Sequence, residues 1–178
     1  MGGEAAWPCE QTLVFGGRDG VLDGQVNALV IWQSKVLSGL MNGTVQAWDM
    51  ATGAHDATLT GHTQRVSALA VNVYRDRLFS FSYDDTIREW EMGTWSVLRI
   101  AKASSNYSDG PQSLVSMGSK LILKGRKLNA QKLQVFGVWS LKCECEVQTD
   151  KTLSCLAAGR GGTVWGGNGT EVVVWGLA

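Results

Sequence analysis

The sequence predicts an all-β fold built from repeated four-stranded antiparallel sheets. Among its 178 residues are 22 glycines and eight tryptophans, but only two prolines. Glycine permits the positive-φ conformations of tight turns, and tryptophan packs well on half-buried pleated surfaces. Apolar residues alternate or come in short bursts, and no long stretch shows the 3.6-residue period of a helix. These features are typical of many short strands joined by turns.

A repeated sequence motif gives the size of the structural unit. The stretch "SGLMNGTVQAWDM" at 38–50 is echoed by "SFSYDDTIREWEM" at 80–92, and their tryptophans, Trp48 and Trp90, lie 42 residues apart. Similarity at a fixed period of this length indicates one supersecondary unit that recurs along the chain.

The first two units each contain four strands in the same order. In the unit 25–60, a strand–turn–strand precedes a third strand that ends at Trp48, and "HDATLT" is the fourth strand. The unit 66–101 repeats this order, with a third strand ending at Trp90 and "SVLRIA" as the fourth. Glycine, aspartate and asparagine at the joints favour turns between these strands.

Two further units continue the pattern with lower fidelity. The unit 112–148 has a strand–turn–strand, a third strand ending near Trp139, and "KCECEVQ" as the fourth strand. The unit 152–178 ends its third strand at Trp175. The polar segment "KASSNYSDGPQ" at 102–112 is expected to be a surface loop.

The segment "CEQTLVFGG" at 9–17 is predicted to be a lone fourth strand. If the chain closes into a ring, this strand can complete the last unit and cover both exposed sheet edges. Residues 1–178 are therefore interpreted as a single domain.

The best unit resembles a known repeat. "LTGHTQRVSALAVNVYRDRLFSFSYDDTIREWE" is similar to a WD repeat, the four-stranded blade of a β-propeller, and the first unit keeps the "GTVQAWD" of that pattern. The resemblance implies that His62, Ser80, Asp84 and Trp90 form a hydrogen-bonded chain, which would fix the register of the blade and perform no chemistry.

The number of blades leaves three arrangements open, because most members of this family resemble seven-bladed rings. The chain can form a small closed ring of four blades, part of a longer propeller, or half of a ring completed by another copy. An open arrangement exposes sheet edges and apolar blade faces, which favours self-association or completion by further blades.

The resemblance implies a non-catalytic scaffold or adaptor that binds protein partners, in an intracellular complex such as a ubiquitin ligase. Loops at the ends of strands would carry the contacts. The candidate partner-binding residues are Met41, Gln64, Arg65, Tyr83 and Asp85, each of which can equally be an ordinary surface residue.

Charge gives little support to nucleic-acid binding. Sixteen basic residues balance sixteen acidic ones, so no net attraction to nucleic acid or to an anionic membrane follows. The alternative of an RNA-associated propeller depends on the basic turn 124–132, with Lys124, Arg126, Lys127 and Lys132. Because this turn has no aromatic residue for base stacking, we expect a solvated turn or a partner-docking patch.

An enzyme on a propeller scaffold, such as a hydrolase, is the least favoured alternative. The chain has only two histidines, His55 on an expected exposed strand and His62 in the structural network. Glu89 and Glu91 are interpreted as solvent-facing, and no nucleophile motif, phosphate-binding loop or metal spacing is present. The sequence predicts no catalytic residue, no metal site and no cofactor.

The remaining features indicate a cytoplasmic or nuclear protein. The four cysteines, Cys9, Cys143, Cys145 and Cys155, are too irregularly spaced for a disulfide scaffold and are expected to be reduced. The N-terminus lacks the pattern of a signal peptide, and the longest apolar run, at 28–32, is too short to span a bilayer.

Overall fold

The computed structural model describes residues 24–103, 113–127, 130–149, 153–159, 162–168 and 171–176. Within these ranges the chain forms four antiparallel sheets, three with four strands and the last with three. The expected strand 9–17 and most of the expected loop 102–112 lie outside the described residues. No helical segment among the described residues has the length and apolarity needed to cross a bilayer.

Each sheet is built from consecutive strands of the chain, so every strand pairs with its neighbour in sequence. The first sheet contains β1 (Val26–Trp32), β2 (Lys35–Leu40), β3 (Val45–Asp49) and β4 (His55–Leu59). The second contains β5 (Val66–Asn72), β6 (Arg77–Ser82), β7 (Thr86–Glu91) and β8 (Val97–Lys102). The third contains β9 (Ser113–Met117), β10 (Lys120–Lys127), β11 (Ala130–Gly137) and β12 (Cys143–Thr149). The fourth contains β13 (Cys155–Ala158), β14 (Thr163–Asn168) and β15 (Glu171–Gly176).

The first two sheets repeat the same strand register. Trp48 on β3 lies opposite Val36, and Trp90 on β7 lies opposite Leu78, one residue in from the end of each pairing. In both sheets the pairing of the third strand with the fourth is irregular immediately before the tryptophan. The repeated sequence motif therefore corresponds to equivalent positions in two copies of one structural unit.

Strand β11 ends at Gly137, near Trp139 as expected, but Trp139 does not take the register position of Trp48 and Trp90. In the third sheet the equivalent position is held by Phe136, which lies opposite Leu121 and follows the same irregularity. Trp139 belongs to the turn between β11 and β12 and is exposed. The chain keeps an aromatic residue at the buried position, but this residue is not a tryptophan. The spacing between tryptophans therefore placed the equivalent position of the third blade at the wrong residue.

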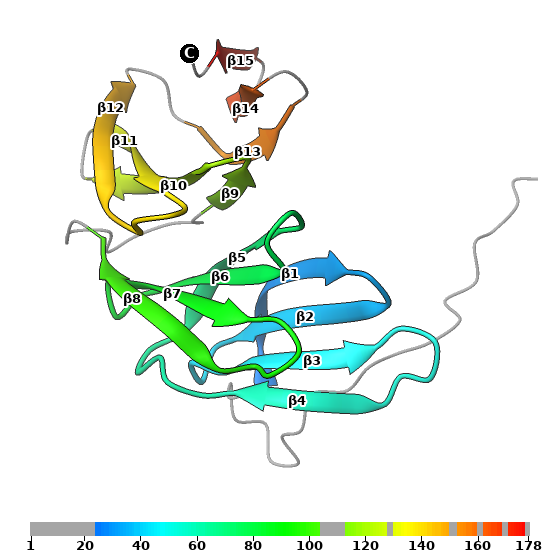
Figure 1. Ribbon diagram of the computed structural model, residues 1–178. Coiled ribbons are helices and arrows are strands. Elements are labelled where there is room, and N and C mark those ends of the chain that lie inside the picture. The colour runs from blue at the N-terminus through cyan, green and yellow to red at the C-terminus, as the bar shows by residue number, and fades with distance from the viewer. Residues whose placement is uncertain are drawn as a thin grey trace, which may run out of the picture.

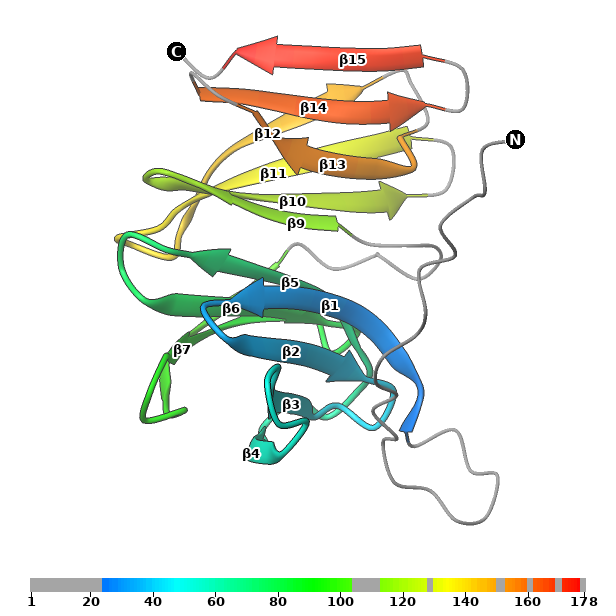
Figure 2. The same cartoon turned by 90° about the vertical axis from the view of Figure 1, so that its right-hand side faces the viewer.

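The four sheets follow one another in space as the blades of a β-propeller (Figures 1 and 2). Their first strands lie innermost, and β1 contacts β5, β5 contacts β9, and β9 contacts β13. Strands β1 and β13 share no comparable contact among the described residues, and Figure 2 shows the first and fourth blades at opposite ends of the row. The described part of the chain is therefore an arc of four blades.

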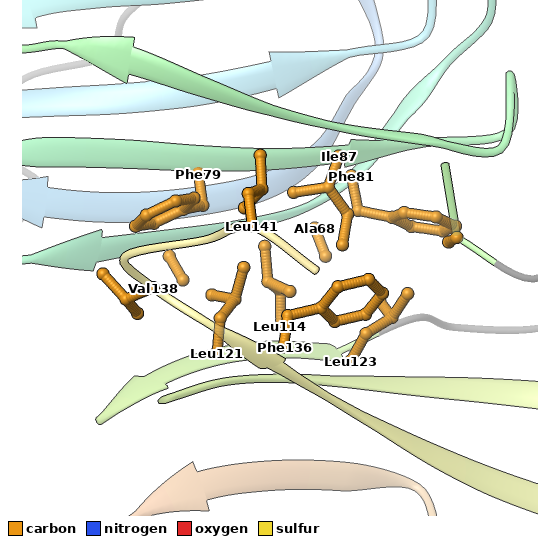
Figure 3. Packing of buried hydrophobic residues seen from close by; sticks show 12 residues of the cluster. Ala68, Phe79, Phe81, Ile87, Leu114, Leu121, Leu123, Phe136, Val138 and Leu141 are labelled. Atoms are coloured by element: carbon orange, nitrogen blue, oxygen red, sulfur yellow. The ribbon is translucent and has the colours of Figure 1, made fainter. Parts of the chain in front are cut away.

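Apolar side chains fill the spaces between neighbouring blades. Between blades two and three, Phe79, Phe81 and Ile87 meet Leu121 and Phe136 in one buried cluster (Figure 3). A second cluster joins blades one and two, and a third joins blades three and four. Burial of apolar surface contributes about 25 cal/mol per Å², so these contacts hold the blades together.

Within the described ranges, each of the two end blades has one face without a neighbouring blade. On β1 the side chains of Leu29 and Ile31 alternate with those packed on blade two, and Leu29 is 63% exposed. On β15 the same alternation leaves Val172 and Val174 outside, and Val172 is 66% exposed. Each end of the arc therefore presents apolar strand residues to solvent.

Candidate functional site

The four side chains of the expected network come together in blade two. His62 lies in the loop before β5, Ser80 on β6, Asp84 in the β6–β7 turn and Trp90 on β7. The Trp90 Nε1–H donates to Ser80 Oγ at 2.8 Å. His62 Nε2 lies 2.7 Å from the same oxygen, and His62 Nδ1 lies 2.9 Å from Asp84 Oδ2. The chain of contacts links the loop to the second and third strands.

Asp84 also organises the turn that carries it. Its Oδ2 accepts the backbone N–H of Thr63 at 3.1 Å, and its Oδ1 accepts the backbone N–H of Thr86 at 3.0 Å and the Thr86 hydroxyl at 2.6 Å. Burial raises the pKa of Asp84, but hydrogen bonds from Thr86, His62 and Thr63 outweigh burial and hold this pKa below its ordinary value. Asp84 is thus an ionised acceptor in the folded chain.

His62 is held in its neutral form. Burial lowers the pKa of its imidazole, and hydrogen bonding to Asp84 offsets only part of that effect. A neutral ring that donates from Nδ1 to Asp84 accepts at Nε2, so the Ser80 hydroxyl donates to it. Every polar side-chain group in the hydrogen-bonded network that runs from Asp84 through His62 and Ser80 to Trp90 then has a partner. The network can therefore fix the register of the blade.

Ser80, His62 and Asp84 share the order of a catalytic triad, but the arrangement cannot meet a substrate. Ser80 is fully buried, and its oxygen already accepts the Trp90 N–H. A nucleophilic hydroxyl must reach a carbonyl carbon from an open pocket. The role of the network is therefore to stabilise the fold of the blade.

The loop residues at this end of blade two are fixed by backbone contacts. The guanidinium of Arg65 lies over the Tyr83 ring, 3.6 Å from its centroid, and the Tyr83 N–H donates to the Arg65 carbonyl at 3.1 Å. The Ser82 hydroxyl donates to the Gln64 carbonyl at 2.8 Å. Asp85, with φ of 61°, ends the turn, and its carbonyl accepts the Ala103 N–H at 2.9 Å.

Blade one contributes the neighbouring turn. The Met41 N–H donates to the Gln25 carbonyl at 2.9 Å, which anchors the β2–β3 turn beside the entry to β1. Gly43, with φ of 84°, lies so close to the loop before β5 that an added Cβ would be 2.7 Å from the His62 carbonyl oxygen. Met41, Gln64, Arg65, Tyr83 and Asp85 are thus brought to one end of two adjacent blades, and this end is called the loop rim below.

A buried charge cluster at the opposite end was missed by sequence reasoning. Glu89 on β7 was expected to face solvent, but its side chain is 1% exposed and its carboxylate pairs with Arg99 and with Arg75 at 3.5 Å. Arg99 and Arg75 also donate to the Val138 carbonyl of blade three, at 2.7 and 3.0 Å. The available signal was the presence of Arg75, Arg77 and Arg99 in the same four-stranded unit as Glu89.

Arg75 and Trp139 extend this cluster to the surface. The Arg75 guanidinium lies 4.2 Å from the centroid of the Trp139 ring, in the turn between β11 and β12. The exposed tryptophan that broke the repeat spacing is therefore held against blade two by a cation–π contact.

The basic turn 124–132 does not present all four of its cations. Lys124 is 2% exposed, and its Nζ donates to the Ser154 carbonyl of blade four at 3.2 Å. The expectation of a solvated turn is wrong for this residue, because its side chain on β10 lies between blade three and blade four. Lys132 forms an ion pair with Glu146. The side chains of Arg126 and Lys127 lie outside the described residues.

The other titratable candidates are scattered. His55 lies on the exposed strand β4, with Nε2 3.0 Å from Thr58 Oγ1. Cys143, Cys145 and Cys155 are free and exposed, and Cys9 lies outside the described residues. Within the described ranges no three histidine, cysteine, aspartate or glutamate side chains are grouped so that they could hold a metal ion.

Comparison with known proteins identifies relatives for about half of the chain. No family model matches the sequence. Pre-mRNA-processing factor 19 of Mus musculus is 32% identical over 89 residues, which are 50% of this chain and 18% of the relative. Autophagy-related protein 16 of Arabidopsis thaliana is 30% identical over 80 residues, 44% of this chain and 15% of the relative. The chain therefore spans less than a fifth of the length of either relative.

Solved structures show the same fold over most of the chain. The computationally designed Ika4 protein has a TM-score of 0.70 at 20% identity, covering 94% of this chain and 99% of the designed one. The RRP9 WD40 repeats have a TM-score of 0.68 at 18% identity, covering 87% of this chain and 47% of that chain. With the repeated blade register, these likenesses show that the described chain has the fold of WD-repeat β-propellers.

Proposed function

We propose that the chain is a non-catalytic protein-interaction scaffold or adaptor that presents the loop rim to a protein partner. The observation that carries this proposal is the convergence of five loop residues from two adjacent blades on one end of the arc. Their backbones are tied by hydrogen bonds, so binding costs little ordering of the chain. Arginine and tyrosine, which form the Arg65–Tyr83 pair, are enriched at the energetic centres of interfaces.

The buried state of Ser80 supports a non-catalytic role. Among the described residues, the one serine that hydrogen-bonds a histidine is enclosed within blade two, and its oxygen accepts the Trp90 N–H. The network that holds it stabilises the surface loops instead, because Asp84 binds the backbone of Thr63 just before Gln64 and Arg65. Rigid loops on a stable scaffold are a common basis for partner recognition.

The names of the relatives support membership of a larger complex. One relative is a pre-mRNA-processing factor and another is an autophagy-related protein, and the solved structure of U3-55K shares the fold. We propose that this chain likewise works within a multiprotein assembly. The processing of pre-mRNA favours the nuclear option over the cytoplasmic one for its location, and a role in a ubiquitin ligase stays a prediction.

Capture of partners by paired variants tests the role of the loop rim. The chain carrying Arg65→Glu with Tyr83→Ser is compared with the unchanged chain, using nuclear and cytosolic extracts and quantitative mass spectrometry. A matched control carries Lys35→Glu with Tyr74→Ser, which makes the same types of change at the opposite end, where Tyr74 is 86% exposed. We expect the rim variant to lose a defined set of proteins that the control retains.

Two controls make the result decisive. Both variants must melt within a few degrees of the unchanged chain, so that loss of partners reflects the surface. Retention of the full set by the rim variant contradicts the proposal. Release of the captured proteins by ribonuclease, with direct binding of RNA, favours the RNA-associated alternative.

A further inference from the structure

A second surface lies on the outer side of the arc, between blades two and three. A groove of about 480 Å³ is lined by residues 99–102 of β8 and by residues 140–143, which end the β11–β12 turn and begin β12. Strands β8 and β12 are the outermost strands of their sheets, and Figure 1 shows both at the outer side of their blades. This feature, called the side groove below, is separate from the loop rim.

The side groove combines apolar contact area with positive charge. Ile100 lines it from β8 and is 54% exposed, and Leu141 lines it from the β11–β12 turn but is itself buried. Because strand residues alternate, the side chains of Ile100 and Lys102 lie on the face of β8 opposite to Arg99 and Ala101, which face blade three. Lys102 and Lys142 are both exposed, and neither forms an ion pair with a described carboxylate. None of the described residues that line the groove is acidic. The charge of the two lysines is therefore available to a ligand.

Strand β8 also offers unpaired backbone groups. One edge pairs with β7, where Ile100 lies opposite Arg88 and Lys102 opposite Thr86. The other edge has no strand partner among the described residues, because β8 is the last strand of its sheet. Alternate N–H and C=O groups on such an edge can pair with an added extended chain.

The base of the side groove is fixed, so the surface is preorganised. Arg99 occupies its inner side but is engaged by Glu89 and by the carbonyls of Val138 and Trp139. These contacts fasten β8 to the β11–β12 turn, which forms the opposite wall. A ligand would meet two walls that are already joined, which lowers the cost of ordering them.

We propose that the side groove binds an extended acidic peptide segment of a partner protein. The peptide adds a strand to the free edge of β8, so that its side chains alternate between the two faces of the extended sheet. An apolar side chain and a carboxylate then lie beside Ile100 and Lys102 on one face, and a further carboxylate lies near Lys142 on the other. An RNA strand would gain from the same charge, but the described residues that line the groove include no aromatic ring for base stacking. Apolar contact together with lysine favours a peptide.

Fluorescence anisotropy of the purified chain with a labelled probe tests this assignment. The probe is a short peptide of alternating aspartate and glutamate with a leucine and a valine at its centre, and its counterpart has asparagine and glutamine in place of the acids. We expect saturable binding of the acidic probe that weakens with added salt. Replacing Lys102 and Lys142 by glutamate should weaken it at least about tenfold, since like charges then face the ligand.

Further variants separate the contributions. Ile100→Ser should weaken binding several-fold without lowering the melting temperature, because the side chain is largely exposed. Lys35→Glu, in blade one, and the rim variant Arg65→Glu with Tyr83→Ser should bind the probe normally. Normal binding by the rim variant separates this surface from the one proposed above, so that either proposal can fail alone.

Four outcomes would overturn the side groove assignment. These are no anisotropy change with the acidic probe, equal binding of its amide counterpart, unchanged affinity in the double lysine variant, and equal competition by a single-stranded RNA of the same charge. The last outcome would identify a general anion-binding surface instead of a peptide groove.

Discussion

The indole N–H of Trp90 donates to the hydroxyl oxygen of Ser80 across two neighbouring strands of blade two, at 2.8 Å. That single contact joins the largest buried side chain of the blade to a chain of polar groups that ends in a surface turn. Because Ser80 also contacts His62, a change at the turn reaches the centre of the blade through two hydrogen bonds.

Removal of the network should destabilise the chain without affecting any reaction. We expect Asp84→Ala or His62→Ala to lower the free energy of unfolding by about 1–3 kcal/mol, because buried donors or acceptors lose their partners. Urea denaturation followed by tryptophan fluorescence measures this change. His55→Ala on the exposed strand β4 is the matched control and should have little effect. An unmoved midpoint for both network variants would show that the four side chains do not stabilise the blade.

Stability should fall as the solution is made mildly acidic. The folded chain lowers the pKa of His62 below its ordinary value of 6.5, so the unfolded chain binds the proton more readily. The free energy of unfolding therefore decreases as pH falls below about 6.5, and levels off below the folded pKa of His62. Asp84 has a lowered pKa as well, and its contribution is lost only as pH falls below its ordinary value of 3.8.

Melting curves between pH 8 and pH 5 test the histidine contribution. His62→Gln cannot titrate in this range, so its melting temperature should vary less with pH than that of the unchanged chain. His55→Gln should keep the original slope. A slope that is unaltered by His62→Gln assigns the pH dependence to other groups.

Loss of the buried carboxylate should weaken the contact between blades two and three and lower the stability of the chain. Glu89→Gln leaves Arg99 and Arg75 without their anionic partner near the Val138 carbonyl, and we expect destabilisation of about 3 kcal/mol. Glu91→Gln removes a partly exposed carboxylate that pairs with Arg77 at 3.3 Å, and should cost less than about 1 kcal/mol. Thermal unfolding of the two variants provides the comparison, and equal costs would argue against a special role for Glu89.

The open faces at the ends of the arc should promote self-association. Leu29 and Ile31 at one end and Val172 and Val174 at the other expose apolar surface of the kind that packs between blades elsewhere in the chain. Sedimentation velocity should show a mass that increases with protein concentration. Ile31→Asp with Val174→Asp should reduce association, whereas Tyr74→Asp should not. A monomer at every concentration would indicate that both faces are covered within one chain.

The strand order and the repeat were readable from the sequence because they depend on local patterns. Period-two alternation, turn residues and the echo of Trp48 in Trp90 locate the strands of the first two blades, and these positions proved equivalent in register. The local pattern did not predict which of two nearby aromatic residues in the third blade takes the position equivalent to Trp48 and Trp90. Phe136 is buried at the repeat position and Trp139 is in the turn, and only strand pairing distinguishes them.

Only the tertiary structure decided which charged side chains are exposed and which are buried. From the sequence alone, Glu89 was interpreted as solvent-facing and Lys124 as part of a solvated turn, yet the neighbouring blade covers both. Burial of these charges becomes possible because distant residues supply partners: Arg99 for the carboxylate and the Ser154 carbonyl for the ammonium. The sequence by itself determined the repeated antiparallel unit, since hydrogen-bond pairing and alternation act over short distances. Which faces meet, which charges are enclosed and where a groove remains depend on how the blades stack, and stacking joins residues that no local pattern connects.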